Sequence, residues 1–189
     1  VYKRQEYNGT IMKISTQIKG MKVQAAKNSR SVFNSKSKLV NISFTNLDTQ
    51  KVTDMSNMFY GCRGLTTLDL SSFDTQNVTN MNYMFSGCSG MTALDLSPID
   101  TRNVTDMYSM FYGCSGLTAL NLSTLDTQNV KYMGFMFSGC SGLTTITTGP
   151  NFKFIGTNYG LSGTWQNTAG ETFTEGNLSL IHISEPTRP

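Results

Sequence analysis

The sequence has few of the residues that most often carry chemistry. Its 189 residues include one histidine, His182, and one tryptophan. Histidine is the side chain that most readily exchanges protons near neutral pH, so its scarcity argues against histidine-based catalytic sites. No glycine-rich phosphate-binding loop stands in a strand-to-helix context. We therefore expect no enzymatic activity, no cofactor and no small-molecule substrate.

Charge is also scarce, at 14% of the residues, and no apolar run reaches the ~18 residues of a membrane helix. Residues 6–51 are basic, with eight Lys and Arg against two acidic residues. A basic stretch can contact an anionic wall polymer or nucleic acid. This one lacks interleaved aromatic residues and any nucleic-acid-binding motif. We interpret it as a solvated flank and expect no nucleic-acid partner.

The cysteines form no C-x-x-C pair and have no histidine to assist them, which argues against zinc. In a stacked array their side chains point the same way, which disfavours a disulfide between neighbours. We predict buried free thiols that act as small apolar side chains. The cysteines recur every 26 residues, at Cys62, Cys88, Cys114 and Cys140.

The two ends of the chain are related at the DNA level. Val1–Gln5 can be encoded by GTG TAT AAG AGA CAG, and the reverse complement of that string encodes Leu178–His182. An inverted repeat of this kind is typical of translated sequencing-adapter DNA, so we assign 1–5 and 178–189 to adapter artefact. Without these ends the net charge falls from +3 to about +1 and no native histidine remains. We read the rest as a fragment of a longer protein.

What the sequence does have is a repeat of 26 residues. Copies span 52–77, 78–103, 104–129 and 130–149, and a degenerate copy precedes them. A unit of this size cannot bury its own apolar face and must stack on its neighbours, so a fixed period of 20–50 residues indicates a solenoid. Such an array favours a surface for binding over a pocket for chemistry.

Each copy predicts one short helix and one strand. In 78–103, Val78, Met81, Phe85 and Cys88 fall on one helical face, and Gly87 suits a helix C-terminus. The methionines of this stripe are in phase with Val and Phe, so we assign them to the core and not to an exposed groove. The following Met91–Ser97 has the L-x-x-L-x-L pattern, with alternate residues inward. The five strands are expected near 39–45, 65–71, 91–97, 117–123 and 143–148.

These elements predict an α/β solenoid of the leucine-rich-repeat type, with about five coils, a concave parallel sheet and short convex helices. We divide the chain into an N-terminal flank or cap (6–31), the solenoid (32–148) and a C-terminal cap of short strands (149–177). The cap is expected because the period is lost after Gly149 and the last coil of a solenoid needs a cover.

The string D-T-x-N-V-T-x-M-x-x-M-F-x-G-C occurs from Asp74 and again at 100–114, and it recurs with one change each at 48–62 (Lys51 for Asn) and 126–140 (Lys131 for Thr). A segment similar to L-x-x-L-x-L-S follows each copy. The repeated string resembles the BspA-type leucine-rich-repeat surface proteins of bacteria. The resemblance implies a secreted protein on the bacterial cell surface, attached to wall or membrane through segments outside this sequence. It also implies binding to host or microbial partners and no enzymatic activity.

The aspartates of this string form a column: Asp48, Asp74, Asp100 and Asp126. Stacked carboxylates attract hard cations such as calcium. Alternatively, each carboxylate accepts a main-chain N–H in an Asx turn. We favour the structural role for Asp74, Asp100 and Asp126, and predict no metal site.

Two surfaces are candidates for ligand binding. The outward strand positions form a polar concave face, which is alternatively a solvated sheet surface. Its candidate residues are Thr67, Asp69, Ser71, Asp95, Ser97, Asn121 and Ser123. Aromatic residues at variable positions point to the convex side, where they either anchor a partner or cover gaps between helical turns. These are Tyr60, Tyr83, Tyr108 and Tyr112, with Tyr132 and Phe135.

We therefore predict an adhesin-like binding module that recognises a host or microbial protein or glycan at the cell surface. The alternative is a spacer that holds another domain away from the wall and has no ligand of its own.

Overall fold

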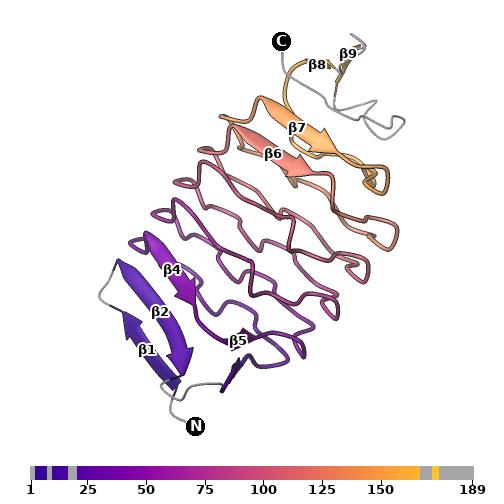
Figure 1. Ribbon diagram of the computed structural model, residues 1–189. Coiled ribbons are helices and arrows are strands. Elements are labelled where there is room, and N and C mark those ends of the chain that lie inside the picture. The colour runs from indigo at the N-terminus through magenta and orange to yellow at the C-terminus, as the bar shows by residue number, and fades with distance from the viewer. Residues whose placement is uncertain (1–2, 8–9, 17–20, 167–171, 175–189) are drawn as a thin grey trace.

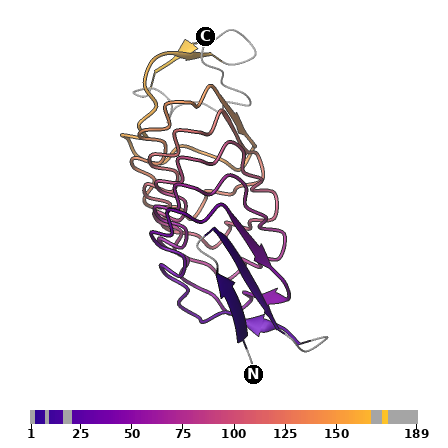
Figure 2. The same cartoon turned by 90° about the vertical axis from the view of Figure 1, so that its left-hand side faces the viewer.

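The computed structural model describes residues 3–7, 10–16, 21–166 and 172–174. Figure 1 shows successive turns of the chain, which we call coils, stacked side by side from the N-terminal strands to the C-terminal ones. Figure 2 shows the stack edge-on, with one row of chain segments along each side. One row, the strand layer, comprises 41–44, 67–70, 93–96, 119–122 and 145–148. The other, the turn layer, comprises 28–35, 54–61, 80–87, 106–113 and 132–139.

The described strands are short. They are β1 (Lys3–Tyr7), β2 (Ile11–Thr16), β3 (Val23–Gln24), β4 (Asn41–Phe44), β5 (Leu47–Asp48), β6 (Ala119–Leu122), β7 (Thr145–Thr148), β8 (Trp165–Gln166) and β9 (Thr172–Phe173). Three pairs are parallel, β2 with β4, β3 with β5 and β6 with β7. The pairs β1–β2 and β8–β9 are antiparallel. The protein therefore has a strand-rich repeat fold.

The strand layer agrees with only part of the prediction. Three of the five expected strands are found, as β4, β6 and β7. The expected alternation holds throughout, since Leu68, Leu70, Leu94 and Leu96 are buried and their neighbours are exposed. However, 67–70 and 93–96 form no strand ladder. The prediction of a continuous five-stranded sheet is wrong for these two segments.

The prediction of convex helices is wrong: the described residues contain no helix. Instead, each segment of the turn layer is a run of tight turns. In 80–87, the N–H groups of Met84 and Ser86 donate to Met81 and Tyr83 three residues earlier, at 3.2 and 3.1 Å. The alternate N–H groups point to the next coil, where Tyr83 N–H donates to the carbonyl of Tyr108 at 2.9 Å.

The correction has a simple cause. A helix would use every N–H within its own segment, whereas here half of them join neighbouring coils. Apolar residues at steps of three suit consecutive turns as well as a helix. Position 83 and its equivalents also take positive φ, as does Gly87 (φ 74°), and positive φ ends a right-handed helix.

A single apolar cluster runs through the stack from Met12 to Trp165. Its centre is a column of parallel phenylalanine rings, one per coil. Their centroids are 5.2, 5.8, 5.7 and 6.1 Å apart along Phe33, Phe59, Phe85, Phe111 and Phe137. The Met55, Met81, Met107 and Met133 column is also buried, as predicted for a core stripe. Each coil therefore contributes equivalent side chains to one shared interior.

The close approach of coils explains the second glycine of each repeat. A Cβ on Gly90 would lie 2.4 Å from the carbonyl oxygen of Arg63 in the preceding coil. No side chain fits at that distance without moving the main chain. The predicted turn at this position thus has a steric reason that depends on the neighbouring coil.

The ends of the fold bear on the domain boundaries. Lys3–Gln5, which the sequence analysis assigns to adapter, pairs with β2 as part of β1. Main-chain pairing accepts any sequence, so this contact carries no information on the origin of these residues. The predicted C-terminal cap contains the short strands β8 and β9. Residues 178–189 lie outside the described residues.

Candidate binding surfaces

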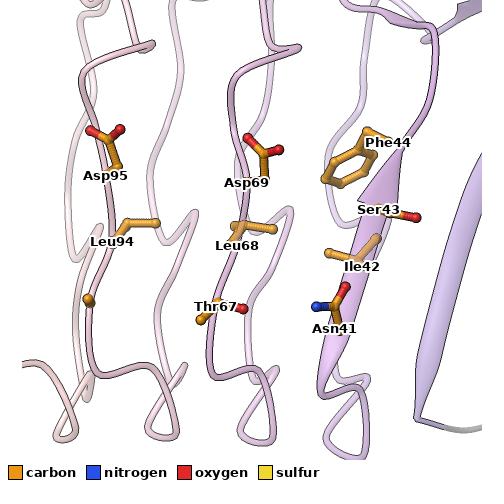
Figure 3. A pocket seen from close by; sticks show the side chains of 10 residues that line it. Asn41, Ile42, Ser43, Phe44, Thr67, Leu68, Asp69, Leu94 and Asp95 are labelled. Atoms are coloured by element: carbon orange, nitrogen blue, oxygen red, sulfur yellow. The ribbon is translucent and has the colours of Figure 1, made fainter.

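The strand layer carries an open depression of about 520 Å³. Its floor is formed by Ile42, Leu68 and Leu94, and its polar residues point outward from three neighbouring coils (Figure 3). Those polar residues are Asn41, Ser43, Thr67, Asp69 and Asp95.

The depression exists because the strand layer is not hydrogen-bonded here. No main-chain hydrogen bond among the described residues joins 67–70 to 41–44 or to 93–96. The nearest one is Thr66 N–H to the carbonyl of Val40, at 3.4 Å. Between these coils most main-chain hydrogen bonds lie in the turn layer, which leaves main-chain groups of 67–70 and 93–96 available to a ligand.

The structure brings three of the predicted concave-face residues into this depression, Thr67, Asp69 and Asp95. Ser71 and Ser97 are not in its lining; their N–H groups donate to the carboxylates of Asp69 and Asp95, at 2.9 and 2.8 Å. Asn121 and Ser123 make the same contact in the next coil after Asp95, at 3.0 Å. The seven predicted residues therefore divide into three residues that line the depression, the two serines that bond to its aspartates, and an equivalent pair in the adjacent coil.

Both aspartates of the depression are charged at neutral pH. The hydroxyl of Ser71 and then its N–H lower the pKa of Asp69. The N–H and hydroxyl of Ser97 do the same for the pKa of Asp95, partly opposed by the charge of Asp69. The depression thus offers two carboxylates above an apolar floor, which suits hydrogen-bond donors or cationic groups of a ligand.

The turn layer carries the predicted aromatic residues. Tyr60, Tyr83, Tyr108 and Phe135 form one continuous series, the aromatic row, with centroids 6.3, 5.5 and 5.7 Å apart and edge-to-face geometry. Desolvation raises the pKa of Tyr108, and Tyr83 adds to this, so the ring stays neutral. Tyr60 and Phe135 are each 40% exposed. Tyr112 is 49% exposed and has no ring contact among the described residues.

Two residues of the aromatic row stand on strained backbone. Tyr83 and Phe135 have φ of 54° and 57°, as do Asn57 and Ser109 at the equivalent position of other coils (55° and 53°). Asparagine visits this left-handed conformation readily, whereas most side chains lose about 1–2 kcal/mol there. Bulky residues at positive φ are uncommon and often mark a functional position.

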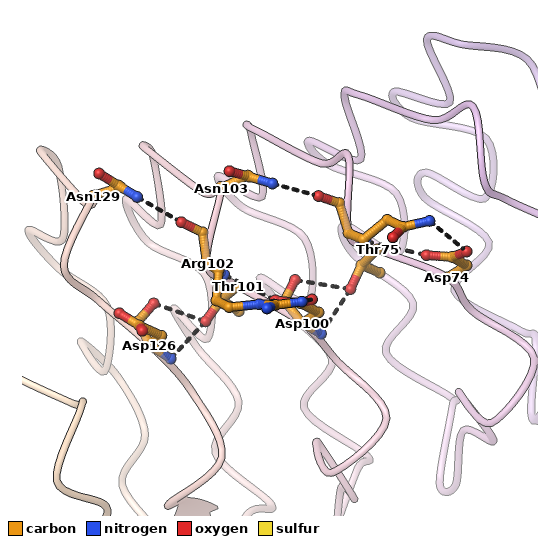
Figure 4. A network of polar contacts seen from close by, with 9 residues as sticks. Asp74, Thr75, Asp100, Thr101, Arg102, Asn103, Asp126 and Asn129 are labelled. Carbon is orange, nitrogen blue, oxygen red and sulfur yellow. Dashed lines mark hydrogen bonds and ion pairs between the residues drawn. The ribbon is translucent and has the colours of Figure 1, made fainter.

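The D-T-x-N corner is structural and includes residues that the sequence analysis missed. Thr75 is buried, and its hydroxyl donates to the carbonyl of Asp100 at 2.9 Å and accepts the Asp100 N–H at 2.8 Å (Figure 4). Thr49, Thr101 and Thr127 make the equivalent contacts. A threonine at the same position of every copy was the available signal.

The asparagine of the corner binds in the other direction. Asn103 Nδ2 donates to the carbonyl of Gln76 in the preceding coil at 2.7 Å, and Asn77 and Asn129 do likewise. Together, the threonine and asparagine join each coil to both of its neighbours.

The aspartates of the corner make the predicted Asx turns. Asp74, Asp100 and Asp126 each accept the N–H of the residue two positions later, at 3.2, 3.0 and 2.8 Å. Asp100 also pairs with Arg102 at 2.6 Å, and this hydrogen bond is the main cause of its lowered pKa. Within the described part of the chain, no three His, Cys, Asp or Glu residues gather in a group that could hold a metal ion.

Comparison with known families assigns the repeat. Residues 5–94 and 85–147 both match the family described as "Mycoplasma protein of unknown function, DUF285". The chain belongs to this family. Searches of curated proteins and of solved structures returned no match.

The two DUF285 matches overlap at 85–94, so the family signature runs without a gap from β1 to β7. It therefore covers both candidate surfaces, the strand-layer depression and the aromatic row. The family description names no activity, so function has to be argued from these surfaces. The described residues contain no helix with the length and apolar character needed to cross a membrane.

The four cysteines of this DUF285 chain are free thiols, as predicted; Cys62, Cys88 and Cys114 are buried and Cys140 is half-buried. Each Sγ donates to the carbonyl of a phenylalanine in the preceding coil, at 3.0–3.2 Å. Burial raises the pKa of Cys62 to about 11 and that of Cys140 to about 12, and raises those of Cys88 and Cys114 further. The thiols therefore stay protonated and unreactive at neutral pH.

Proposed function

We propose that this chain is a non-catalytic binding module of a secreted bacterial surface protein, built as a leucine-rich-repeat-like solenoid of the BspA type. Its ligand is a host or microbial protein or glycan, and attachment to wall or membrane would come from segments outside this sequence. The observation that carries the proposal is the strand-layer depression, where three coils present polar side chains over an apolar floor.

Three features support binding there. The lining residues come from separate repeats, so the stack is needed to assemble them. Asp69 and Asp95 project from turns that are already hydrogen-bonded, which reduces the entropy lost when a ligand orders them. The main-chain groups of 67–70 and 93–96 add donors and acceptors of the kind used in strand addition.

The test uses an isosteric change. Asp69→Asn with Asp95→Asn removes both charges and keeps the turns, since Asn121 occupies the same column and accepts the Ser123 N–H. The matched control, Asn121→Asp, alters charge in that column outside the depression. Arrays of glycans and matrix proteins would be probed with wild type and both variants. We expect a ligand whose binding falls at least tenfold in the double variant only.

The rival function is a spacer without a ligand. It is favoured by the corner, where buried threonines and exposed asparagines join the coils. No binding to any array member by wild type, or equal loss in the double variant and the control, would contradict the binding proposal.

A further inference from the structure

The aromatic row in the turn layer is a second surface, separate from the strand-layer depression. It contains one ring per coil, from Tyr60 through Tyr83 and Tyr108 to Phe135, with successive centroids 5.5–6.3 Å apart. Edge-to-face contacts fix each ring against the next, so the row loses little freedom when it binds.

The backbone beneath two rings of the row indicates that these two residues are not there for stability. Tyr83 and Phe135 hold positive φ at the position where Asn57 adopts the same conformation at lower cost. The core already has its own ring column, in which Phe85 and Phe137 are buried. The exposed rings are therefore additional to the packing of each coil.

The surroundings of the row define the chemistry of its ligand. The four turn-layer segments 54–61, 80–87, 106–113 and 132–139 contain no lysine or arginine. Their two charged residues, Asp54 and Asp106, already accept N–H bonds from Ser56 and Tyr108. Asn82 binds Asp106 at 2.9 Å. The row thus lies among Tyr, Asn, Ser and Gly residues, with two hydrogen-bonded carboxylates and no cationic side chain in these segments.

We propose that the aromatic row binds a neutral linear polysaccharide that runs along the stack of coils. Sugar rings have apolar C–H faces that pack on aromatic rings, and their hydroxyls bond to tyrosine and amide groups. A ligand that repeats at about the spacing of one sugar ring matches a surface that repeats one aromatic ring per coil. A folded protein partner has no such translational repeat, and an anionic polymer would meet no lysine or arginine in these segments.

The test separates a role in binding from a role in packing. Tyr83→Asn and Phe135→Asn each remove one ring and place asparagine where Asn57 already stands. The matched control is Tyr112→Ser, which removes an exposed tyrosine outside the row; Ser86 and Ser138 occupy the same column. Cello- and chito-oligosaccharides of two to six sugars, with heparin as the anionic arm, would be titrated by NMR.

We expect affinity to rise with length up to about four sugars, to fall at least tenfold in Tyr83→Asn and Phe135→Asn, and to be unchanged in Tyr112→Ser. Thermal midpoints of the two row variants should stay within a few degrees of wild type. Binding of heparin alone, no binding of any neutral chain, or equal effects of all three variants would overturn the proposal. The strand-layer double variant should leave this binding unchanged, so the two proposals fail independently.

Discussion

Replacing Thr101 by valine should destabilise the protein far more than its conservative size suggests. The hydroxyl of Thr101 is buried, donates to the carbonyl of Asp126 at 2.8 Å and accepts the Asp126 N–H at 2.8 Å. Valine has the same shape and neither function. Two main-chain groups of the next coil would then lose their partner together.

The magnitude follows from the cost of unpaired buried groups. Each such group costs about 1–3 kcal/mol, so the free energy of unfolding should fall by roughly 2–6 kcal/mol. At about 2–4 °C per kcal/mol for a chain of this size, that corresponds to a decrease in Tm of roughly 4–24 °C. Thermal and urea unfolding followed by circular dichroism would measure it, with midpoints compared because repeat proteins can depart from two-state behaviour.

Thr105→Val is the matched control. Thr105 Oγ1 also donates to a carbonyl of a neighbouring coil, that of Thr79, at 3.1 Å. However, the Thr105 N–H donates to the same carbonyl at 2.8 Å, so the carbonyl keeps a partner without the hydroxyl. We expect a loss below about 1 kcal/mol. Equal destabilisation by the two variants would refute the argument that the corner threonines join the coils.

Three further predictions concern the close approach of the coils, the buried thiols and the aspartate column. Gly90→Ala should lower Tm by more than Gly134→Ala. The added Cβ would lie 2.4 Å from a main-chain oxygen at position 90 but 3.3 Å from a tyrosine ring at position 134. The reverse order of melting temperatures would count against the stacking geometry. The free energy of unfolding should fall as pH rises from about 9 to about 11. The buried thiol of Cys62 keeps its proton in the folded state, whereas the thiol of the unfolded chain ionises near pH 9. Urea unfolding at a series of pH values measures this change, and a flat profile would contradict it. Calcium should leave Tm unchanged, because the carboxylates of Asp74 and Asp126 already accept main-chain N–H bonds. A rise in Tm of several degrees that EDTA reverses would show instead that the aspartate column binds the ion.

The apolar plan of the fold could be predicted from the sequence. Residues in phase at 26-residue intervals, such as Phe85 and Phe111, indicate a shared interior without reference to any structure, and both are buried. The thiols could be predicted for the same reason, since spacing and the lack of histidine exclude their usual ligand chemistry.

The turn layer could not be predicted, because apolar residues at Met81, Met84 and Phe85 suit a helix and a run of turns equally. What decides between them is whether the N–H of Tyr83 bonds within its segment or to Tyr108, and that contact is between coils. The role of Thr75 was missed for a similar reason. A threonine beside an aspartate is common in turns, and only the neighbouring coil shows that its hydroxyl faces inward.

The strand-layer depression was beyond prediction as well. Thr67, Asp69 and Asp95 were candidates from their outward positions, as were Ser97 and Asn121 on the same face. Which of them line a binding surface depends on where the strand layer lacks hydrogen bonds. The sequence pattern of 67–70 and that of 119–122 are nearly the same, and the structure makes a strand of the second only.

The central claim is that the coils are joined mainly through the turn layer and that 67–70 and 93–96 form no hydrogen-bonded ladder in the strand layer. Residue-resolved amide hydrogen exchange by NMR tests this most directly. The N–H groups of Met81, Tyr83 and Phe85, which bond to the next coil, should exchange orders of magnitude more slowly than those of Leu68 and Leu94. Equal protection of the two layers, or greater protection of the strand layer, would contradict the account.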